Sequence, residues 1–242
     1  MRRMAERGAT VVLGVGFAQA DAISKVAAEF PDTNFSIIDV SWLDAPNLRQ
    51  YAFKEHEGSY IVGVAAAKAS KTGKVGFVGG MDIGLIRRFA CGYVGGVKSI
   101  NASAEVYQNM TGTTPAAWND PAKGAELTQS QIDRGADVVY HAAGGTGAGV
   151  IQAAADAGKL AIGVDSNQNG MAPGSVLTSM LKRVDVAAYE TFMDVKNGNF
   201  SAGVHVLGLA EGGVDWALDE NNASLVTADM KAAIESARAD IV

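Results

Sequence analysis

The stretch Val138–Gln168, VVYHAAGGTGAGVIQAAADAGKLAIGVDSNQ, decides the fold because it reads as one complete βαβ unit. An apolar run leads into a glycine-rich turn at 144–147, a helix of small residues follows, and a second apolar run ends in Asp165. The glycines allow a positive φ and a close approach of the backbone to a ligand, because they carry no Cβ. Asp165 therefore lies at the carboxyl end of a predicted parallel strand, which is where open α/β sheets bind ligands.

The glycine-rich turn does not match a dinucleotide-binding turn. Gly144, Gly145, Gly147 and Gly149 do not fit the spacing G-x-G-x-x-G. Asp165 ends a strand whose own turn carries no glycine fingerprint, so it does not fit the ribose clamp of such a site. On this stretch alone, a structural role with no ligand at the turn is the commoner meaning of such a unit.

Length and composition favour a globular α/β chain. The 242 residues are 48% hydrophobic and 19% charged, and the length is sufficient for two small lobes with sizeable cores. The formal net charge is −6, and no block of lysine or arginine is present. An acidic surface repels the phosphate backbone, so the sequence argues against a nucleic-acid partner. No run of apolar residues is long enough to span a bilayer directly.

Cysteine and histidine usage excludes several kinds of site. The single cysteine, Cys91, rules out an intrachain disulfide and a Cys/His zinc site. The three histidines, His56, His141 and His205, are scattered, so their spacing supports neither a metal site nor a Ser-His-Asp triad. With no phosphate loop and no nucleophile–base pair, we expect no enzyme, no cofactor and no metal. For His141, which ends the strand before the glycine turn, we favour a hydrogen-bonded side chain over a ligand contact.

The βα rhythm repeats on both sides of a polar break at 71–73, which we take as a lobe boundary. The amino lobe then comprises residues 1–72 and about 183–242, and the carboxyl lobe comprises residues 73–182. Ligands of such proteins bind between the lobes, at the carboxyl ends of both sheets. Predicted helices cover 20–30, 57–70, 83–99, 122–134, 182–196 and 227–239, and predicted strands outside the opening stretch cover 10–16, 34–40, 51–55, 74–78, 104–108, 175–181 and 203–216.

The amino terminus, MRRMAERGATVVLGVGFAQA, imitates a secretory signal peptide. It has arginines, a short apolar run and small residues at a cleavage-like position. Glu6 lies within the charged region, however, and the apolar run contains glycines and β-branched residues, as a buried strand does. Cleavage after Ala20 would also remove a strand that the next βα segment needs for pairing. We therefore favour a strand, and find no convincing signal or lipobox in this chain.

Seven segments carry a pattern that none of them shows alone. They read GVGFAQADAI, FKEHEGSYIVGVAAAKASKTGKVGFVGG, IRRFACGYVGGV, DPAKG, GADVVYHAAGGTGAGVI, IGVDSNQ and VLTSMLKRVDVA. Together, from Val11 to about Val214, they resemble the basic membrane protein (BMP) family, the purine-nucleoside-binding substrate-binding components of ABC transporters.

The resemblance implies a type I periplasmic-binding-protein-like fold, with two doubly wound parallel-sheet lobes and a cleft between them. It implies a solute-binding protein that captures a purine nucleoside or related base for an ABC importer, with the permease subunits as partners and no chemistry. The location implied is periplasmic or at the cell surface, as a membrane-anchored lipoprotein. The alternative is a small-molecule-sensing regulatory module of the same fold, which would need a DNA-binding or signalling segment at its amino end.

Carried over residue by residue, the resemblance implies several polar ligand contacts. Asp165 would accept hydrogen bonds from ribose hydroxyls, because an ionised carboxylate only accepts. Gly144 and Gly145 would present backbone groups to the ligand. Lys182 would donate to the ribose or the base, whereas a solvated lysine at a helix start would do nothing. Asp39 would add a second carboxylate, although aspartates at strand ends often only cap loops.

Two aromatic residues would stack on the base. Phe89 lies in the segment IRRFACGYVGGV, near a predicted helix start, and its alternative is core packing at helical spacing with Leu85 and Tyr93. Trp118 lies in the loop before DPAKG, and its alternative is a plug that covers this loop. Both alternatives remain open at the level of the sequence.

One departure from the family pattern bears on the fold. Family members carry, before the segment that matches Met1, a signal or lipobox region and a first βαβ portion whose loop holds acidic, amide and aromatic ligand contacts. We therefore expect an amino-terminally truncated member, from an internal start at Met1 or Met4. Because the missing strands are central in a doubly wound lobe, the strand at Val11 would have an unpaired edge. We expect this edge to cause dimerisation or aggregation, and the missing loop to weaken ligand binding.

Overall fold

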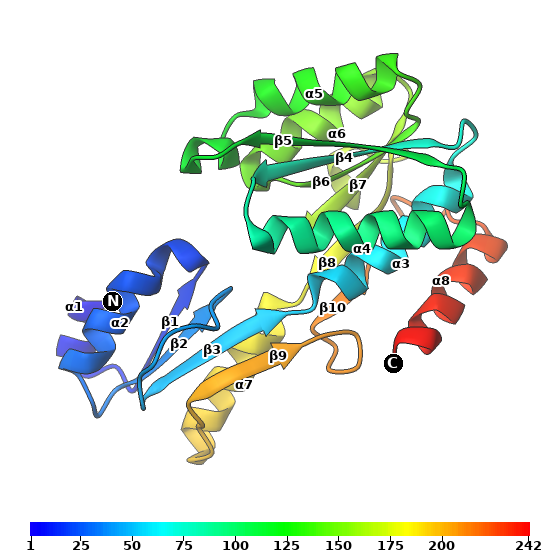
Figure 1. Ribbon diagram of the computed structural model, residues 1–242. Coiled ribbons are helices and arrows are strands. Elements are labelled where there is room, and N and C mark those ends of the chain that lie inside the picture. The colour runs from blue at the N-terminus through cyan, green and yellow to red at the C-terminus, as the bar shows by residue number, and fades with distance from the viewer. The chain divides into compact units, whose positions relative to one another are not determined.

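A computed structural model describes all residues from Met1 to Val242, and it divides into two compact units (Figure 1). The amino unit consists of Met1–Lys54 and Arg183–Gly213, and the carboxyl unit consists of Glu55–Lys182 and Val214–Val242. Each unit has its own sheet with parallel strands and flanking helices, so the expected α/β fold class is confirmed. No helix combines the length and the apolar character that crossing a bilayer requires.

The amino unit is built on a four-stranded parallel sheet. Its elements are α1 (Arg2–Glu6), β1 (Val11–Val15), η1 (Phe17–Gln19), α2 (Ala20–Glu29), β2 (Asn34–Ile38), β3 (Leu48–Phe53), α7 (Val184–Asn197) and β9 (Gly203–Leu207). The strand order is β1-β2-β3-β9, so β1 is an edge strand, as expected for the strand at Val11. Ile23 of α2 packs with Phe35 and Ile37 of β2 in a fully buried core, because the apolar residues of α2 recur at helical spacing.

The carboxyl unit is built on a six-stranded sheet. Its elements are α3 (Glu55–Ala69), β4 (Lys74–Met81), α4 (Gly84–Ile100), β5 (Glu105–Gly112), η2 (Pro115–Trp118), α5 (Pro121–Asp133), β6 (Val138–Ala142), η3 (Gly144–Thr146), α6 (Gly147–Asp156), β7 (Leu160–Asp165), η4 (Asn169–Met171), β8 (Val176–Lys182), β10 (Val214–Trp216) and α8 (Ala228–Ile241). The strand order is β10-β8-β7-β6-β4-β5, and only β10 is antiparallel to its neighbour. Figure 1 shows α3 and α4 on one face and α5 and α6 on the other. Covered on both faces, β6 is buried at every position.

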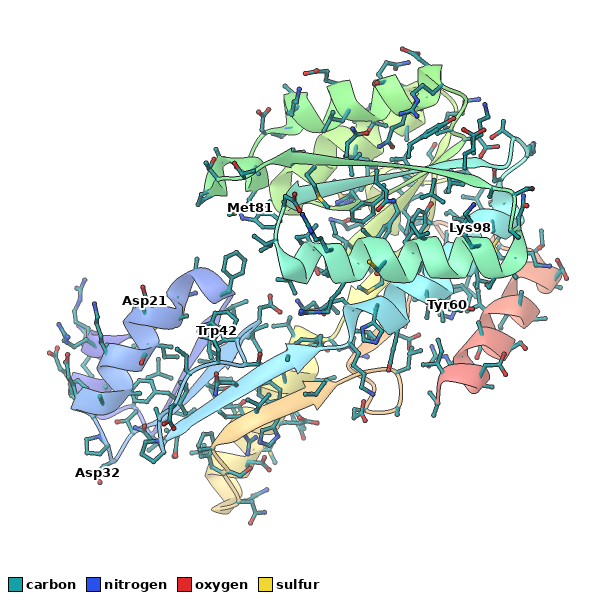
Figure 2. The ribbon with its side chains drawn as sticks, viewed as in Figure 1. Asp21, Asp32, Trp42, Tyr60, Met81 and Lys98 are labelled. Carbon is teal, nitrogen blue, oxygen red and sulfur yellow. The ribbon has the colours of Figure 1, made fainter.

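Local sequence signals account for the helices that flank this sheet. Asp120 caps α5, because its Oδ1 accepts from the N–H of Lys123 at 2.9 Å and Pro121 occupies the first turn. Glycines bring α3 and α4 into close contact, since a Cβ at Gly96 would overlap the backbone of Tyr60, a residue of α3 that is labelled in Figure 2. The helices therefore pack at a distance that only a missing side chain permits.

The first crossing between the units differs from the expected lobe boundary. The sequence suggested a boundary at Gly73, at the end of the amino lobe 1–72, whereas the chain passes from the amino unit to the carboxyl unit between Lys54 and Glu55. The reason is tertiary: α3 packs along α4 and also contacts β8, both of the carboxyl unit. The polar break at 71–73 is a turn between α3 and β4 within one unit.

The second and third crossings lie between Lys182 and Arg183 and between Gly213 and Val214. The segment 203–216, expected as one strand-like region, is therefore divided between β9 of the amino sheet and β10 of the carboxyl sheet. The terminal helix α8 packs on α3 and belongs to the carboxyl unit, although the sequence assigned it to the amino lobe. Strand β8 lies wholly in the carboxyl unit, where it pairs with β7 and β10.

Candidate ligand-binding site

The predicted ligand residues of the carboxyl unit gather at one edge of its sheet. Strands β8, β7, β6, β4 and β5 run parallel in this order, so their carboxyl ends share an edge, where Figure 2 labels Met81 at the end of β4. Lys182 is the last residue of β8, and Asp165 is the last residue of the adjacent β7. Gly144 opens the turn after β6, and Trp118 ends the turn η2 after β5. Strand order thus makes neighbours of residues that are far apart in the sequence.

Asp165 combines exposure with an unusual backbone conformation. Its φ is 65°, and Asp39, with a φ of 68°, is the other non-glycine residue with a positive φ. A left-handed conformation costs an L-residue about 1–2 kcal/mol, and aspartate tolerates it better than most. Asp165 ends β7 and Asp39 directly follows β2. Each unit therefore has a parallel strand that turns sharply at an aspartate, at the carboxyl edge of its sheet.

Hydrogen bonds of Gln168 fix the loop that follows Asp165. The Oε1 atom of Gln168 accepts from the N–H of Val164 at 2.9 Å and lies 2.9 Å from Nε2 of His141. The N–H of Gln168 donates to Oγ of Ser179 at 2.9 Å. Because an amide oxygen is an acceptor, Nε2 of His141 carries the proton in this arrangement. The loop is thus held by partners on β6, β7 and β8.

His141 is a buried, hydrogen-bonded side chain, which is the interpretation that the sequence favoured. Its ring lies on β6 against Gly147, where a Cβ would overlap the imidazole. Burial lowers the pKa of His141 from 6.5 to about 4, although the hydrogen bond with Gln168 opposes this shift. The ring is therefore neutral at pH 7, and its hydrogen bond with Gln168 holds the loop after Asp165 in place.

Lys182 is buried, so its alternative as a solvated residue at a helix start is wrong. Its side chain is 5% exposed, and its Nζ lies 3.4 Å from Oε1 of Glu55. The same ammonium lies 5.8 Å from the ring centroid of Phe89, within the range of a cation–π interaction. Lys182 is the end of strand β8, and α7 begins at Val184.

Phe89 shows the core-packing arrangement that the sequence left open as an alternative. It lies on α4 and is 3% exposed, and Tyr93, one turn further along the same helix, is fully buried. Its ring lies beneath the ammonium of Lys182. Stacking of Phe89 on a base stays a prediction, since it requires the ring to become accessible to the ligand.

Trp118 packs across the glycines at the carboxyl edge. A Cβ at Gly80 would overlap the indole, and a Cβ at Gly144 would lie 3.6 Å from it. The hydroxyl of Thr146 donates to the carbonyl of Ala117 at 2.8 Å, which joins η2 to the glycine turn. Trp118 is half-buried. It therefore packs over the ends of β4 and β6, in line with the plug interpretation.

The glycine turn presents backbone at the same edge. Gly144 and Gly145 are exposed, and Gly144 has a φ of 56°. The turn η3 leads directly into α6, whose first N–H groups have no partner within the helix. Gly144 and Gly145 can therefore present backbone groups to a ligand, because neither carries a side chain.

Asp39 lies in the amino unit, directly after β2. Its side chain is half-buried, and its N–H donates to the carbonyl of Tyr51 at 2.8 Å. It occupies the carboxyl edge of the four-stranded sheet, the position that corresponds to Asp165 in the carboxyl unit.

Sequence reasoning missed Glu55. It is the first residue of α3 and is fully buried, and its Oε2 accepts from Nε of Arg88 at 2.8 Å. The sequence placed Glu55 at the end of a predicted strand, 51–55, whereas the structure ends β3 at Phe53 and begins α3 at Glu55. The available signal was its setting in FKEHEGSY, because Phe53 precedes it and the small residues Gly58 and Ser59 follow it at helical spacing.

Comparison with known protein families gives a match over nearly the whole chain. A model of the Bmp family, described as "ABC transporter substrate-binding protein PnrA-like", matches residues 1–241. The ABC transporter nucleoside-binding protein BmpA of Lactococcus lactis is 36% identical over 255 residues, which cover 98% of this chain and 70% of that protein. The CD4+ T-cell-stimulating antigen of Listeria innocua is 34% identical over 249 residues, which cover 96% and 68%.

Solved structures share the architecture. An ABC transporter system solute-binding protein from Aeropyrum pernix superposes with a TM-score of 0.87 at 27% identity, over 99% of this chain and 76% of that one. A transcriptional activator of the comK gene from Bacillus halodurans superposes with a TM-score of 0.86 at 24% identity, over 98% and 80%. At that identity, the second likeness is one of fold alone.

Proposed function

Because this chain belongs to the Bmp family of ABC transporter substrate-binding proteins, we propose that it captures a purine nucleoside and presents it to the permease subunits of an ABC importer. The family model is described as an ABC transporter substrate-binding protein, and the Lactococcus lactis relative is named a nucleoside-binding protein. The identity of the ligand, a purine nucleoside or a related purine base, is argued from the residues of the site.

The observation that carries the proposal is the placement of Asp165 and Lys182 at the ends of neighbouring strands. A carboxylate offers only acceptors, and an ammonium offers only donors. Each hydroxyl of a ribose diol can donate to the first group and accept from the second. The pair therefore suits a ribose, and charge-assisted hydrogen bonds would give it strength and orientation.

Other groups at the same edge would serve the base. Trp118 is half-buried at this edge, and we propose that its indole stacks on the planar purine. The exposed turn at Gly144 and Gly145 offers backbone N–H groups to the ring nitrogens and oxygens. Asp39, at the carboxyl edge of the separate amino-unit sheet, stays a predicted ligand contact of that unit.

A relative supports the ligand class and suggests the setting. The Lactococcus lactis protein that is 36% identical to this chain is named a nucleoside-binding protein of an ABC transporter. From membership of a family of ABC transporter substrate-binding proteins, we also propose a location in the periplasm or at the cell surface, as a membrane-anchored lipoprotein.

Isothermal titration with adenosine, guanosine and inosine tests the proposal. We expect at least one of them to bind, while free ribose binds more weakly because it lacks the base. In a thermal denaturation, that nucleoside at 100 times its Kd should stabilise the protein by about 2.7 kcal/mol. No heat of binding and no thermal shift with any of the three at millimolar concentration would rule out a purine nucleoside.

A further inference from the structure

Glu55 is a buried carboxylate with unused hydrogen-bonding capacity. Its side chain is 0% exposed, and Oε2 accepts from Nε of Arg88. Oε1 is buried and makes no hydrogen bond, and the ammonium of Lys182 lies 3.4 Å from it. A buried carboxylate is strongly unfavourable without a compensating cation. Glu55 therefore constrains where the ammonium of Lys182 can lie.

The same ion pair lies where the chain passes between the units. Glu55 is the first residue of the carboxyl unit, and Lys182 is its last residue before the chain continues into the amino unit. Val214, at which the chain returns, pairs in register with Lys182. One pair of charges thus joins the start of α3 to the end of β8, at the edge that holds Asp165.

We propose that Glu55 is a positioning residue, which holds the ammonium of Lys182 in the place from which it donates to the ligand. This inference rests on the proposed function, because it assigns Lys182 to the nucleoside. The ammonium lies near both Oε1 of Glu55 and the ring of Phe89, and Arg88 keeps the carboxylate oriented. A lysine that is already ordered loses little side-chain entropy when a ligand binds, so the pair raises affinity through preorganisation.

A double-mutant cycle tests whether Glu55 acts through Lys182. The unsubstituted chain is first titrated with adenosine, guanosine and inosine, and the tightest binder is used for Glu55→Gln, Lys182→Met and the double variant. Glu55→Gln keeps the shape of the side chain and removes its charge. We expect it to raise Kd about tenfold in the unsubstituted chain and less than about threefold when residue 182 is already methionine, as for residues in direct contact.

Glu57→Gln is the matched control, because it removes the same charge from the same first turn of α3, where Glu57 lines a groove with Arg87 and Cys91. We expect its Kd to equal that of the unsubstituted chain. If Glu55→Gln weakens binding equally with and without Lys182, its role is structural and the inference is wrong.

A second variant keeps the test decisive if Glu55→Gln does not melt cooperatively. Arg88→Met leaves Glu55 and Lys182 in place and removes only the partner of Oε2, so we expect a smaller rise in Kd that also depends on Lys182. A rise that persists in the Lys182→Met background would contradict the inference. If the unsubstituted chain binds none of the three nucleosides, the proposed function fails; if it binds and neither variant changes Kd, this inference alone fails.

Discussion

Asp165 holds its carboxylate at the sheet edge by adopting a conformation that most residues avoid. Its left-handed backbone persists because the loop after it is fixed by Gln168, which in turn is held by His141 and Ser179. The sequence could identify Asp165, because a carboxylate at the end of an apolar run is a local signal. We did not single out Glu55 from the sequence, because the burial that distinguishes its side chain depends on contacts with α4 and β8.

Substitutions at Asp165 should separate strain from binding. Asp165→Gly should be more stable than Asp165→Ala by about 1 kcal/mol, because glycine adopts a positive φ without a steric penalty. Both variants should lose nucleoside binding, since both lack the carboxylate. Urea denaturation gives the stabilities and isothermal titration the affinities. An alanine variant as stable as the glycine variant would show that the backbone at 165 is not strained.

His141 should make stability depend on pH. The unfolded chain binds a proton on this ring below pH 6.5, whereas the folded ring, with its pKa at about 4, does not. The contribution of the neutral His141 to the free energy of unfolding is therefore fully present above pH 6.5. It is lost as the pH falls from 6.5 toward 4, and it amounts to about 3 kcal/mol. Urea denaturation between these pH values should show a flatter dependence for His141→Gln than for the exposed control His56→Gln. Equal slopes would contradict the buried state of His141.

At the scale of elements, the close packing of α3 on α4 depends on glycines that interrupt an otherwise apolar pattern. The spacing of apolar residues predicted both helices, and the structure places them at 55–69 and 84–100. What spacing could not reveal is how the helices fit together, because contact between backbones depends on two helices far apart in the sequence. Strand order is hidden for the same reason, and with it the neighbourhood of Lys182 and Asp165.

Alanine substitutions on α4 should have opposite effects at two glycines. Gly96→Ala should destabilise the protein by about 2 kcal/mol or more, because the new methyl group would overlap the backbone of Tyr60. Gly84→Ala should be neutral or stabilising by up to about 1 kcal/mol, since nothing lies within 4 Å of a Cβ there and alanine favours helix. Thermal or urea denaturation measures both. Similar effects at both positions would mean that α3 and α4 can move apart to admit a methyl group at residue 96 at little cost in stability.

At the scale of the whole molecule, the chain confirms the fold that the sequence suggested and corrects its division. Apolar periodicity and the combined motifs were sufficient to predict two α/β lobes and the family. The lobe boundary near Gly73 was misplaced, because the break at 71–73 is a polar turn and local polarity says nothing about which sheet a helix covers. The terminal helix α8 was assigned to the other lobe for the same reason.

The open edge of the amino sheet should promote self-association. β1 pairs with β2 on one side only, and Val15 at its end is 53% exposed. An unpaired edge with apolar residues offers a template for another strand. Sedimentation velocity over a range of concentrations should show dimers or larger species, and Val15→Lys should reduce them. A monodisperse monomer that melts cooperatively would contradict this expectation.

The register of β8 and β10 gives the molecule a modular character. Lys182 and Val214 face each other on antiparallel strands, so residues 183–213 are the very long loop of a β-hairpin. A tight turn of about two residues is the ordinary connection between such strands. A short turn could therefore connect β8 to β10 in place of residues 183–213. In topological terms, the amino unit consists of this insertion and of the segment Met1–Lys54, which precedes the carboxyl unit.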